Sequence, residues 1–189
     1  MSRLMAATIG AWLGFATLII SPVSSAERPI GAAEGWTTDP ATGCAVWNAA
    51  PKGGQSVVFE GNCLNGRAGG NGRARWYRDG NLTSIYKGGF KAGRPHGHGI
   101  YLLTDGSQYT GGFLDGRRHG QGVRVWPNGN RFEGEFRNGK RHGPGIMDFA
   151  DGLRYAGPYA NGKPHGAGGC YTPDRGQWAC RWMRGKLVE

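Results

Sequence analysis

One short motif recurs every 23 residues along most of this chain. Its copies begin at Tyr86, Tyr109, Phe132 and Tyr155. The second copy reads Y-T-G-G-F-L-D-G-R-R-H-G-Q-G. A further copy begins at Phe59 in a longer unit that runs to Ile85, and half a copy begins at Trp178. So strict a period indicates an array of one small structural unit, here five full units and one half.

Each unit has the pattern of a β-hairpin. Residues 109–113 alternate with the period of two that is typical of a strand. Asp-Gly at 115–116 tolerates the positive φ angles of a tight turn, and residues 122–126 read as the return strand. A second turn at 105–106 connects neighbouring units. No stretch after residue 30 has helical spacing, so we expect an all-β, single-layer antiparallel meander.

Glycine makes up 37 of the 189 residues, a content that without fixed positions would indicate disorder. Here each unit places one glycine between two aromatic residues on one strand face, which predicts room for the aromatic ring of a neighbouring repeat. This glycine column comprises Gly88, Gly111, Gly134 and Gly157. The aromatic residues are expected to stack as a thin core ladder. The ladder comprises Tyr86, Phe90, Tyr109, Phe113, Phe132, Phe136, Tyr155 and Tyr159, with Trp76, Leu103, Trp126 and Phe149 from the return strands.

The recurring columns of aromatic residue, glycine, Asn-Gly, basic residue, His-Gly and Asp-Gly resemble the MORN (membrane occupation and recognition nexus) repeat family. The resemblance covers about residues 59 to 187. It implies an elongated, solenoid-like sheet with a binding or scaffolding role, in some members at membranes. Gly69, Arg175 and Cys180 depart from the pattern, and all three lie in terminal units, where atypical caps are expected.

Residues 1–26 differ from the array. A short basic start precedes an apolar stretch at 4–20, and Ser24-Ser25-Ala26 follows. These features predict a secretory signal peptide at residues 1–26 that is cleaved before Glu27. An uncleaved anchor is the alternative, although the apolar stretch is short for a bilayer span. Residues 27–58 then form an N-terminal segment with a capping strand, and residues 59–189 form the repeat array.

Four cysteines in an exported chain favour disulfide bonds. Cys44 and Cys63 flank a turn-like segment at 51–54, and Cys170 and Cys180 flank another at 173–176. We therefore expect Cys44–Cys63 and Cys170–Cys180 bonds, each across a hairpin and at opposite ends of the array. A zinc site or a redox site would need a C-x-x-C motif, which is absent from the sequence.

The histidine column does not predict a metal site. Equivalent histidines in successive hairpins should lie about 10 Å apart, too far to share one ion. We expect His-Gly to shape the entry into the return strand, with the imidazole bonded locally. The column comprises His96, His119, His142 and His165. Paired acids, nucleophile motifs and phosphate-binding loops are also lacking in the sequence, so we expect no enzyme, no cofactor and no metal.

Charge carries the main functional prediction. The formal net charge is +10, of which +9 belongs to residues 27–189. A basic residue follows the tight-turn glycine in every unit, which predicts a basic edge with a period of about 10 Å. The candidate residues are Arg94, Arg117, Arg118, Lys140, Arg141, Lys163 and Lys186, after Arg67 in the first unit. A solvated edge that resists aggregation is the alternative. An anionic lipid, glycan or protein would fit this edge, whereas the exported compartment argues against nucleic acid.

The face opposite the aromatic ladder has a second candidate site. The return strands place apolar residues there, in a stripe that comprises Ile100, Leu102, Val123, Val125 and Ile146. Such a stripe indicates a homodimer face, a protein partner or a cover formed by residues 27–58. An end strand of the meander is a further site for pairing with a second copy.

These features together predict a non-catalytic binding or scaffold protein of the cell envelope, periplasmic or secreted and peripheral to the membrane. An accessory subunit that positions the substrate of a partner envelope enzyme is the alternative. A stand-alone hydrolase is a third hypothesis, with no residues in the sequence to support it.

Overall fold

A computed structural model of the protein describes residues 35–188, which form one 15-stranded sheet. These residues contain no helix, and therefore no helical segment among them is long and apolar enough to cross a bilayer. The all-β meander expected from the repeats is confirmed. The expected signal peptide at 1–26 lies outside the described residues and stays a prediction.

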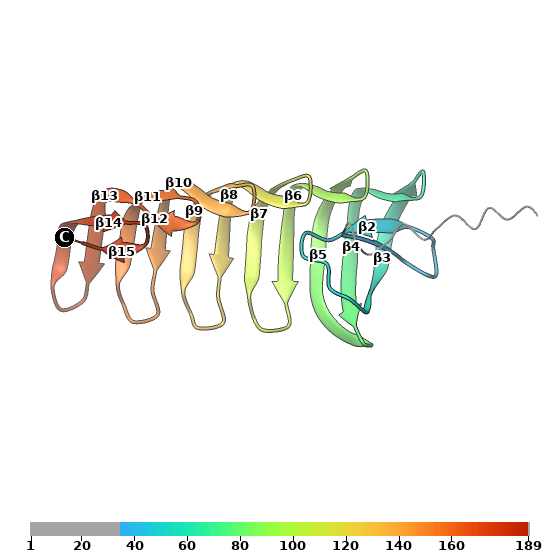
Figure 1. Cartoon of the computed structure of the whole chain (residues 1–189), viewed down its shortest axis with the longest axis horizontal. Helices are drawn as coiled ribbons and strands as arrows, with labels where there is room; N and C mark the ends of the chain where they lie inside the picture. The colour runs from blue at the N-terminus through green and yellow to red at the C-terminus, as the bar shows by residue number, and fades with distance from the viewer. Residues whose placement is uncertain (1–34, 189) are drawn as a thin grey trace, which may run out of the picture.

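Successive strands pair side by side and build an elongated rod (Figure 1). Pairing is antiparallel except between β2 and β4, which meet in parallel at Ala45 and Arg67. Two strands lie off the main path, since β3 pairs with β4 and β12 with β11. The strands are β1 (Trp36–Thr38), β2 (Ala45–Trp47), β3 (Gln55–Leu64), β4 (Arg67–Arg78), β5 (Asn81–Lys91), β6 (Arg94–Leu103), β7 (Gln108–Leu114), β8 (Arg117–Val125), β9 (Arg131–Arg137), β10 (Lys140–Asp148), β11 (Arg154–Ala160), β12 (Lys163–Pro164), β13 (Gly166–Thr172), β14 (Gly176–Met183) and β15 (Lys186–Leu187).

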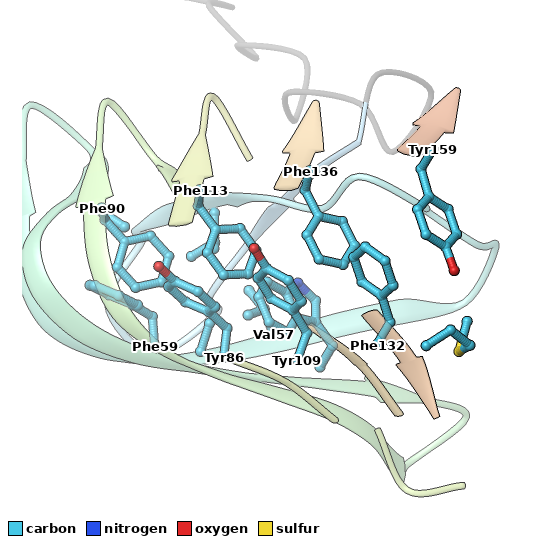
Figure 2. Close-up of a cluster of buried hydrophobic side chains, with 14 of the residues drawn as sticks. Val57, Phe59, Tyr86, Phe90, Tyr109, Phe113, Phe132, Phe136 and Tyr159 are labelled. Atoms are coloured by element: carbon cyan, nitrogen blue, oxygen red, sulfur yellow. The ribbon is translucent and has the colours of Figure 1, made fainter. Parts of the chain in front are cut away.

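The sheet is creased along its length. Tyr109 and Phe113 lie four residues apart on one strand, so in a straight strand they would be about 13 Å apart. Their ring centroids are instead 5.2 Å apart, and both side chains are buried. The strand therefore bends sharply between them. Figure 2 shows the result: Phe90, Phe113 and Phe136 descend from one half of the sheet toward Tyr86, Tyr109 and Phe132 on the other.

The crease coincides with a bulge in each return strand. Gly111 pairs with Gly122, but Phe113 already pairs with Arg118, so the return strand carries two additional residues at this point. Gly120 of the His-Gly pair adopts a φ of +70° there, which glycine tolerates without a steric penalty. The His-Gly pair therefore bends the return strand itself, rather than shaping its entry as expected.

Tyrosine hydroxyl groups close the bend in three units. The hydroxyl group of Tyr86 donates to the carbonyl oxygen of Gly89, and that of Tyr109 donates to Gly112, each at 3.0 Å. Tyr155 makes the equivalent hydrogen bond at 3.2 Å. Burial raises the pKa of Tyr109 to about 12. The hydroxyl group therefore remains a donor across the physiological pH range.

Aromatic rings connect the units without interruption. Tyr86, Tyr109 and Phe132 each meet the second-position ring of their own unit and that of the next edge to face, as with Tyr86–Phe113 at 5.0 Å and Tyr109–Phe136 at 5.0 Å. Tyr155 makes the corresponding contacts with tilted rings. All eight ladder residues expected from the repeats are buried, with Trp76. Trp126 and Phe149 are partly buried against them, as is Tyr101, which the sequence reasoning did not include. Leu103, expected in the ladder, is 37% exposed instead.

Paired glycines form a continuous row along the crease. Gly99 pairs with Gly111, and Gly122 pairs with Gly134. A Cβ atom at Gly111 of the predicted column would lie 2.5 Å from the Cα atom of Gly122 and 2.7 Å from the hydroxyl oxygen of Tyr109 in the same unit, and a Cβ atom at Gly122 would overlap the Tyr109 ring. The glycines therefore make room for the paired strand and for the ring of their own repeat, not for the ring of a neighbour as predicted.

The N-terminal end is closed by residues 35–64. β1 and β2 form a hairpin, the buried carboxylate of Asp39 accepts a hydrogen bond from the Phe59 amide at 2.9 Å, and Cys44 is bonded to Cys63. The disulfide pairing is as predicted, but its setting differs. β2 pairs with β1 and β4 rather than with β3, so the bond spans the start of β4 instead of a hairpin.

The C-terminal end is closed by the hairpin β13–β14. The predicted Cys170–Cys180 bond joins its two strands, with the Cα atoms 5.7 Å apart. Trp182 covers the last ladder rings, with its ring centroid 5.5 Å from that of Tyr155. Each end of the array thus has one disulfide bond.

Gly145→Ala should destabilise the protein by about 1–3 kcal/mol, because the added Cβ would lie 2.5 Å from ring atoms of Phe132. Gly169→Ala is the matched control, since its nearest neighbour would be 3.8 Å away. Urea unfolding measures both. Combining Gly145→Ala with Phe132→Leu should give less than the sum of the two effects. Equal destabilisation by Gly145→Ala and Gly169→Ala would contradict the ring-on-glycine packing.

Cys170→Ala/Cys180→Ala should lower the free energy of unfolding by about 2–3 kcal/mol, the expected entropic effect of opening a 10-residue loop. Hydrogen exchange should show the loss of protection confined to the last unit, since each unit contacts only its neighbours. Uniform loss of protection over the whole array would show that the units do not unfold separately.

Candidate functional site

The tight turns form one continuous edge. Each is a two-residue turn with positive φ at both positions, such as Asn138 at +51° and Gly139 at +82°. In every tight turn after the first, the glycine amide donates to a carbonyl oxygen of the preceding unit, as from Gly116 to Pro95 at 2.8 Å and from Gly139 to Arg118 at 2.9 Å. These hydrogen bonds stack the turns and hold the residue after each glycine in the same place on every unit.

Most of the predicted basic residues lie on this edge, each as the first residue of a return strand. Arg117, Lys140, Lys163 and Lys186 are exposed. Arg94 is half-buried, because its guanidinium lies 4.9 Å from the ring centroid of Trp47 and 5.4 Å from that of Trp36. A polar hollow of about 390 Å³ lies within the edge, lined by Arg117, Arg137, Asn138, Lys140, His142 and Asn161.

Arg118 and Arg141 were expected on the basic edge, but they do not lie with the exposed basic residues. Arg118 points into the crease, 5.7 Å from the ring centroid of Tyr109, and donates to the carbonyl oxygen of Gly139 at 2.9 Å. Arg141 points inward in the same way and donates to Gly162 at 2.6 Å. Strand alternation explains the difference, since consecutive residues on a strand face opposite sides.

Arg124 is a third inward-facing arginine, and the sequence reasoning missed it. Its guanidinium lies 4.5 Å from the ring centroid of Trp126. The equivalent positions of the other units hold Ala74, Tyr101, Met147 and Cys170. Comparison of this position between units could have identified Arg124, because the other units have an alanine, a tyrosine, a methionine or a disulfide-bonded cysteine there.

We call Arg118, Arg124 and Arg141 the crease arginines. Burial disfavours their charged form. Burial, with the neighbouring Arg118 and Arg141, lowers the pKa of Arg124 to about 10. Burial also lowers the pKa of Arg118 and of Arg141 below the usual range for arginine. Within residues 35–188, no carboxylate lies within ion-pair distance of any of the three.

A cavity of about 340 Å³ opens beside the crease arginines. Five aromatic residues line it, together with aliphatic and neutral polar residues, and its charged lining residues are all basic. The aromatic residues are Trp47, Trp76, Tyr101, Tyr109 and Phe113, and the basic ones are Arg117, Arg118 and Arg124. Trp47 brings the N-terminal segment to the mouth of this cavity. The cavity therefore combines largely apolar walls with positive charge that no carboxylate of the described residues meets at ion-pair distance.

The apolar stripe lies on the outer face, as expected, but it is discontinuous. Ile100 pairs with Thr110, which pairs with Val123, and Val123 pairs with Glu133, so polar residues alternate with apolar ones across the strands. Val125 pairs with Arg131, and the row of Ile146 continues through Ala156.

Only part of the stripe is well exposed. Ile100 is 37% exposed and Leu102 is 39% exposed, whereas Val123, Val125 and Ile146 are intermediate. Residues 47–50 of the N-terminal segment line the cavity on the inner side, and hence do not form the outer cover that was one expectation.

The histidine column contributes no metal centre within the described part of the chain, where no group of three or more His, Cys, Asp or Glu residues is placed to hold an ion. His165 accepts a hydrogen bond from the Arg184 amide at 3.4 Å, while Nδ1 of His119 is buried without a partner among the described residues. The ring of His165 is thus hydrogen-bonded to the turn of the following unit rather than locally as expected, and Nδ1 of His119 makes no such bond within residues 35–188.

Comparison with known proteins gives one family. The model of the MORN repeat matches residues 86–108, 109–131, 132–154 and 155–178. No curated protein matches the chain. The structure continues the same architecture beyond the matched repeats, because Phe59 packs edge to face on Phe90 and Gly61 pairs with Gly72 in the unit that precedes them.

Replacing Arg124 by methionine, as in the next unit, should stabilise the protein at pH 7. The lowered pKa means that the unfolded state binds more protons between about pH 10 and the ordinary pKa of arginine, so stability rises with pH in that range. The destabilisation caused by the buried charge is therefore fully present at neutral pH. We expect a gain of about 0.5–2 kcal/mol in urea unfolding. Arg131→Met, at a half-buried arginine that is paired with Glu133, is the control and should bring no gain. A loss of stability in Arg124→Met would show that the guanidinium is well satisfied.

Proposed function

Because the chain is a MORN repeat protein, with four consecutive repeats over residues 86–178, we propose that it is a non-catalytic binding and scaffold protein of the cell envelope. Its tight-turn edge binds an anionic surface, such as lipid head groups or an acidic glycan. Two disulfide bonds are typical of an oxidising, non-cytoplasmic compartment, which supports export by the expected signal peptide.

The charge difference between the two sets of turns carries this proposal. With one flanking residue on each side, the six tight turns hold nine basic residues and one acid, Asp115. The five turns that connect the hairpins, on the lower side of Figure 1, hold four basic residues and five acids by the same definition. If the basic residues served only solubility, both sets of turns would be expected to share them.

The geometry of the edge suits an extended ligand. Each unit adds two strands, so its basic residue recurs at about 10 Å. Arg117, Lys140 and Lys163 follow one another at this interval on units held in register by the stacked turns. A rigid row of separated charges binds a surface or a polymer through the sum of weak contacts, each worth about 1 kcal/mol near an anionic membrane.

The triple variant Arg117→Glu/Lys140→Glu/Lys163→Glu tests the proposal and leaves the crease arginines in place. Arg78→Glu/Arg154→Glu/Arg175→Glu is the matched control, because it makes the same change of net charge at the turns that connect the hairpins. The measurement is cosedimentation with lipopolysaccharide and with vesicles of phosphatidylcholine in which roughly one lipid in three is phosphatidylglycerol. Binding should weaken as salt rises from about 20 to about 150 mM. The edge variant should lose about 100-fold in affinity, while the control keeps most of it.

Equal loss in both triple variants would mean that net charge alone is responsible. Absence of binding by the unmodified protein at low salt would overturn the proposal. The exposed Ile100 and Leu102 would then favour the second candidate function, an accessory subunit that docks on a partner envelope protein.

A further inference from the structure

The crease arginines are a second basic cluster, separate from the tight-turn edge. Arg118 and Arg141 occupy the inward position that other units fill with buried small or cyclic residues, namely Ala68, Pro95 and Pro164. Arg124 occupies a core position in the unit between the N-terminal hairpin and the C-terminal cap. Three neighbouring core-facing positions are therefore charged in the middle of the array only.

The hydrogen-bond and ring partners of these three guanidiniums are neutral, and the carboxylate of Asp105 acts on Arg124 only from beyond ion-pair distance. Arg118 and Arg141 donate to the backbone carbonyl oxygens of Gly139 and Gly162 and lie over aromatic rings. Arg124 lies over Trp126, and no residue among 35–188 accepts a hydrogen bond from it. A half-buried arginine normally has a carboxylate partner, because desolvation of an unpaired charge is unfavourable. Arg124 therefore has donors that are free to bind an anion.

The adjoining cavity offers an apolar environment for the rest of such a ligand. Its volume of about 340 Å³ is at the lower end of the range for small-molecule sites. Trp76 and Tyr101 lie 6.1 Å apart between ring centroids and both line it. Trp76 is 1% exposed, and its indole N–H has no hydrogen-bond partner among the described residues. Buried donors are nearly always satisfied, so this one also indicates a missing acceptor.

We propose that this cavity binds a small amphipathic anion, a carboxylate or phosphate carried on a planar aromatic body. The oxyanion lies on the guanidiniums of Arg118 and Arg124, which present charge-assisted donors in a fixed fork geometry. The aromatic body lies among Trp76, Tyr101 and Tyr109. Arg117 lines both the cavity and the tight-turn edge, but the site does not depend on the proposed function of that edge, because Arg118 and Arg124, which hold the oxyanion, take no part in it.

Isothermal titration calorimetry on the full mature chain tests the site with four probes. They are 2-naphthoate, 2-naphthyl phosphate, the neutral isostere 2-naphthamide, and inorganic phosphate. We expect the first two to bind at least tenfold more tightly than the neutral amide, which lacks the charge, and than inorganic phosphate, which lacks the ring. Whichever of the two amphipathic anions binds more tightly identifies the preferred oxyanion.

Two variants locate the binding. Arg124→Met should weaken both amphipathic anions at least tenfold, and since this change is expected to stabilise the fold, loss of binding will not reflect unfolding. Lys163→Met removes the same charge from the tight-turn edge and should leave the affinities unchanged. Equal affinity for naphthoate and naphthamide, unchanged binding in Arg124→Met, or no binding of either anion at millimolar concentration would each overturn the proposal. None of these results would alter vesicle binding by the edge.

Discussion

Edge-to-face contact between aromatic rings is the interaction on which the rest of the structure depends. A single β-sheet has no second layer to cover its apolar face. Here the sheet supplies its own cover by bending along the glycine row, which brings Phe113 onto both Tyr109 and Tyr86. The same contact closes one unit and joins it to the next. The same set of contacts therefore stabilises each unit and holds neighbouring units together. The bulge at His-Gly bends the backbone so that these contacts can form.

Much of this fold was predictable, because the residues that determine it recur at equivalent positions of every repeat. Repeated aromatic residues, turn glycines and cysteine positions predicted the hairpins, the meander and both disulfide pairs. The crease was not predicted, because alternation along 109–113 is the same for a straight strand and a bent one. Only the later His119-Gly120, with its positive φ, marks the two additional residues in the return strand. The environment of Cys44 was also missed, since pairing of β2 with β4 depends on chain crossings that local sequence does not encode.

The candidate sites divide in a similar way. Arg117, Lys140 and Lys163 could be placed from sequence, because a residue next to a tight turn has only one edge on which to lie. Arg118 and Arg141 could not be placed by counting basic residues alone, since side chains one position apart on a strand face opposite sides. Arg124 required comparison between units rather than within one. The repeats thus carry two separate sets of basic residues. The residues that follow the turn glycines form the exposed edge, and the inward-facing residues of the return strands determine what lies in the crease.

The crease also has a mechanical consequence. A flat strip of sheet one layer thick bends and twists easily, whereas a strip folded lengthwise resists bending, for the same reason that an angled beam is stiffer than a flat bar of equal mass. The hydrogen-bonded turns and interlocked rings hold the two halves of this protein at a fixed angle. We therefore expect the rod to resist bending. One additional unit would extend its length by a fixed increment without making it more flexible.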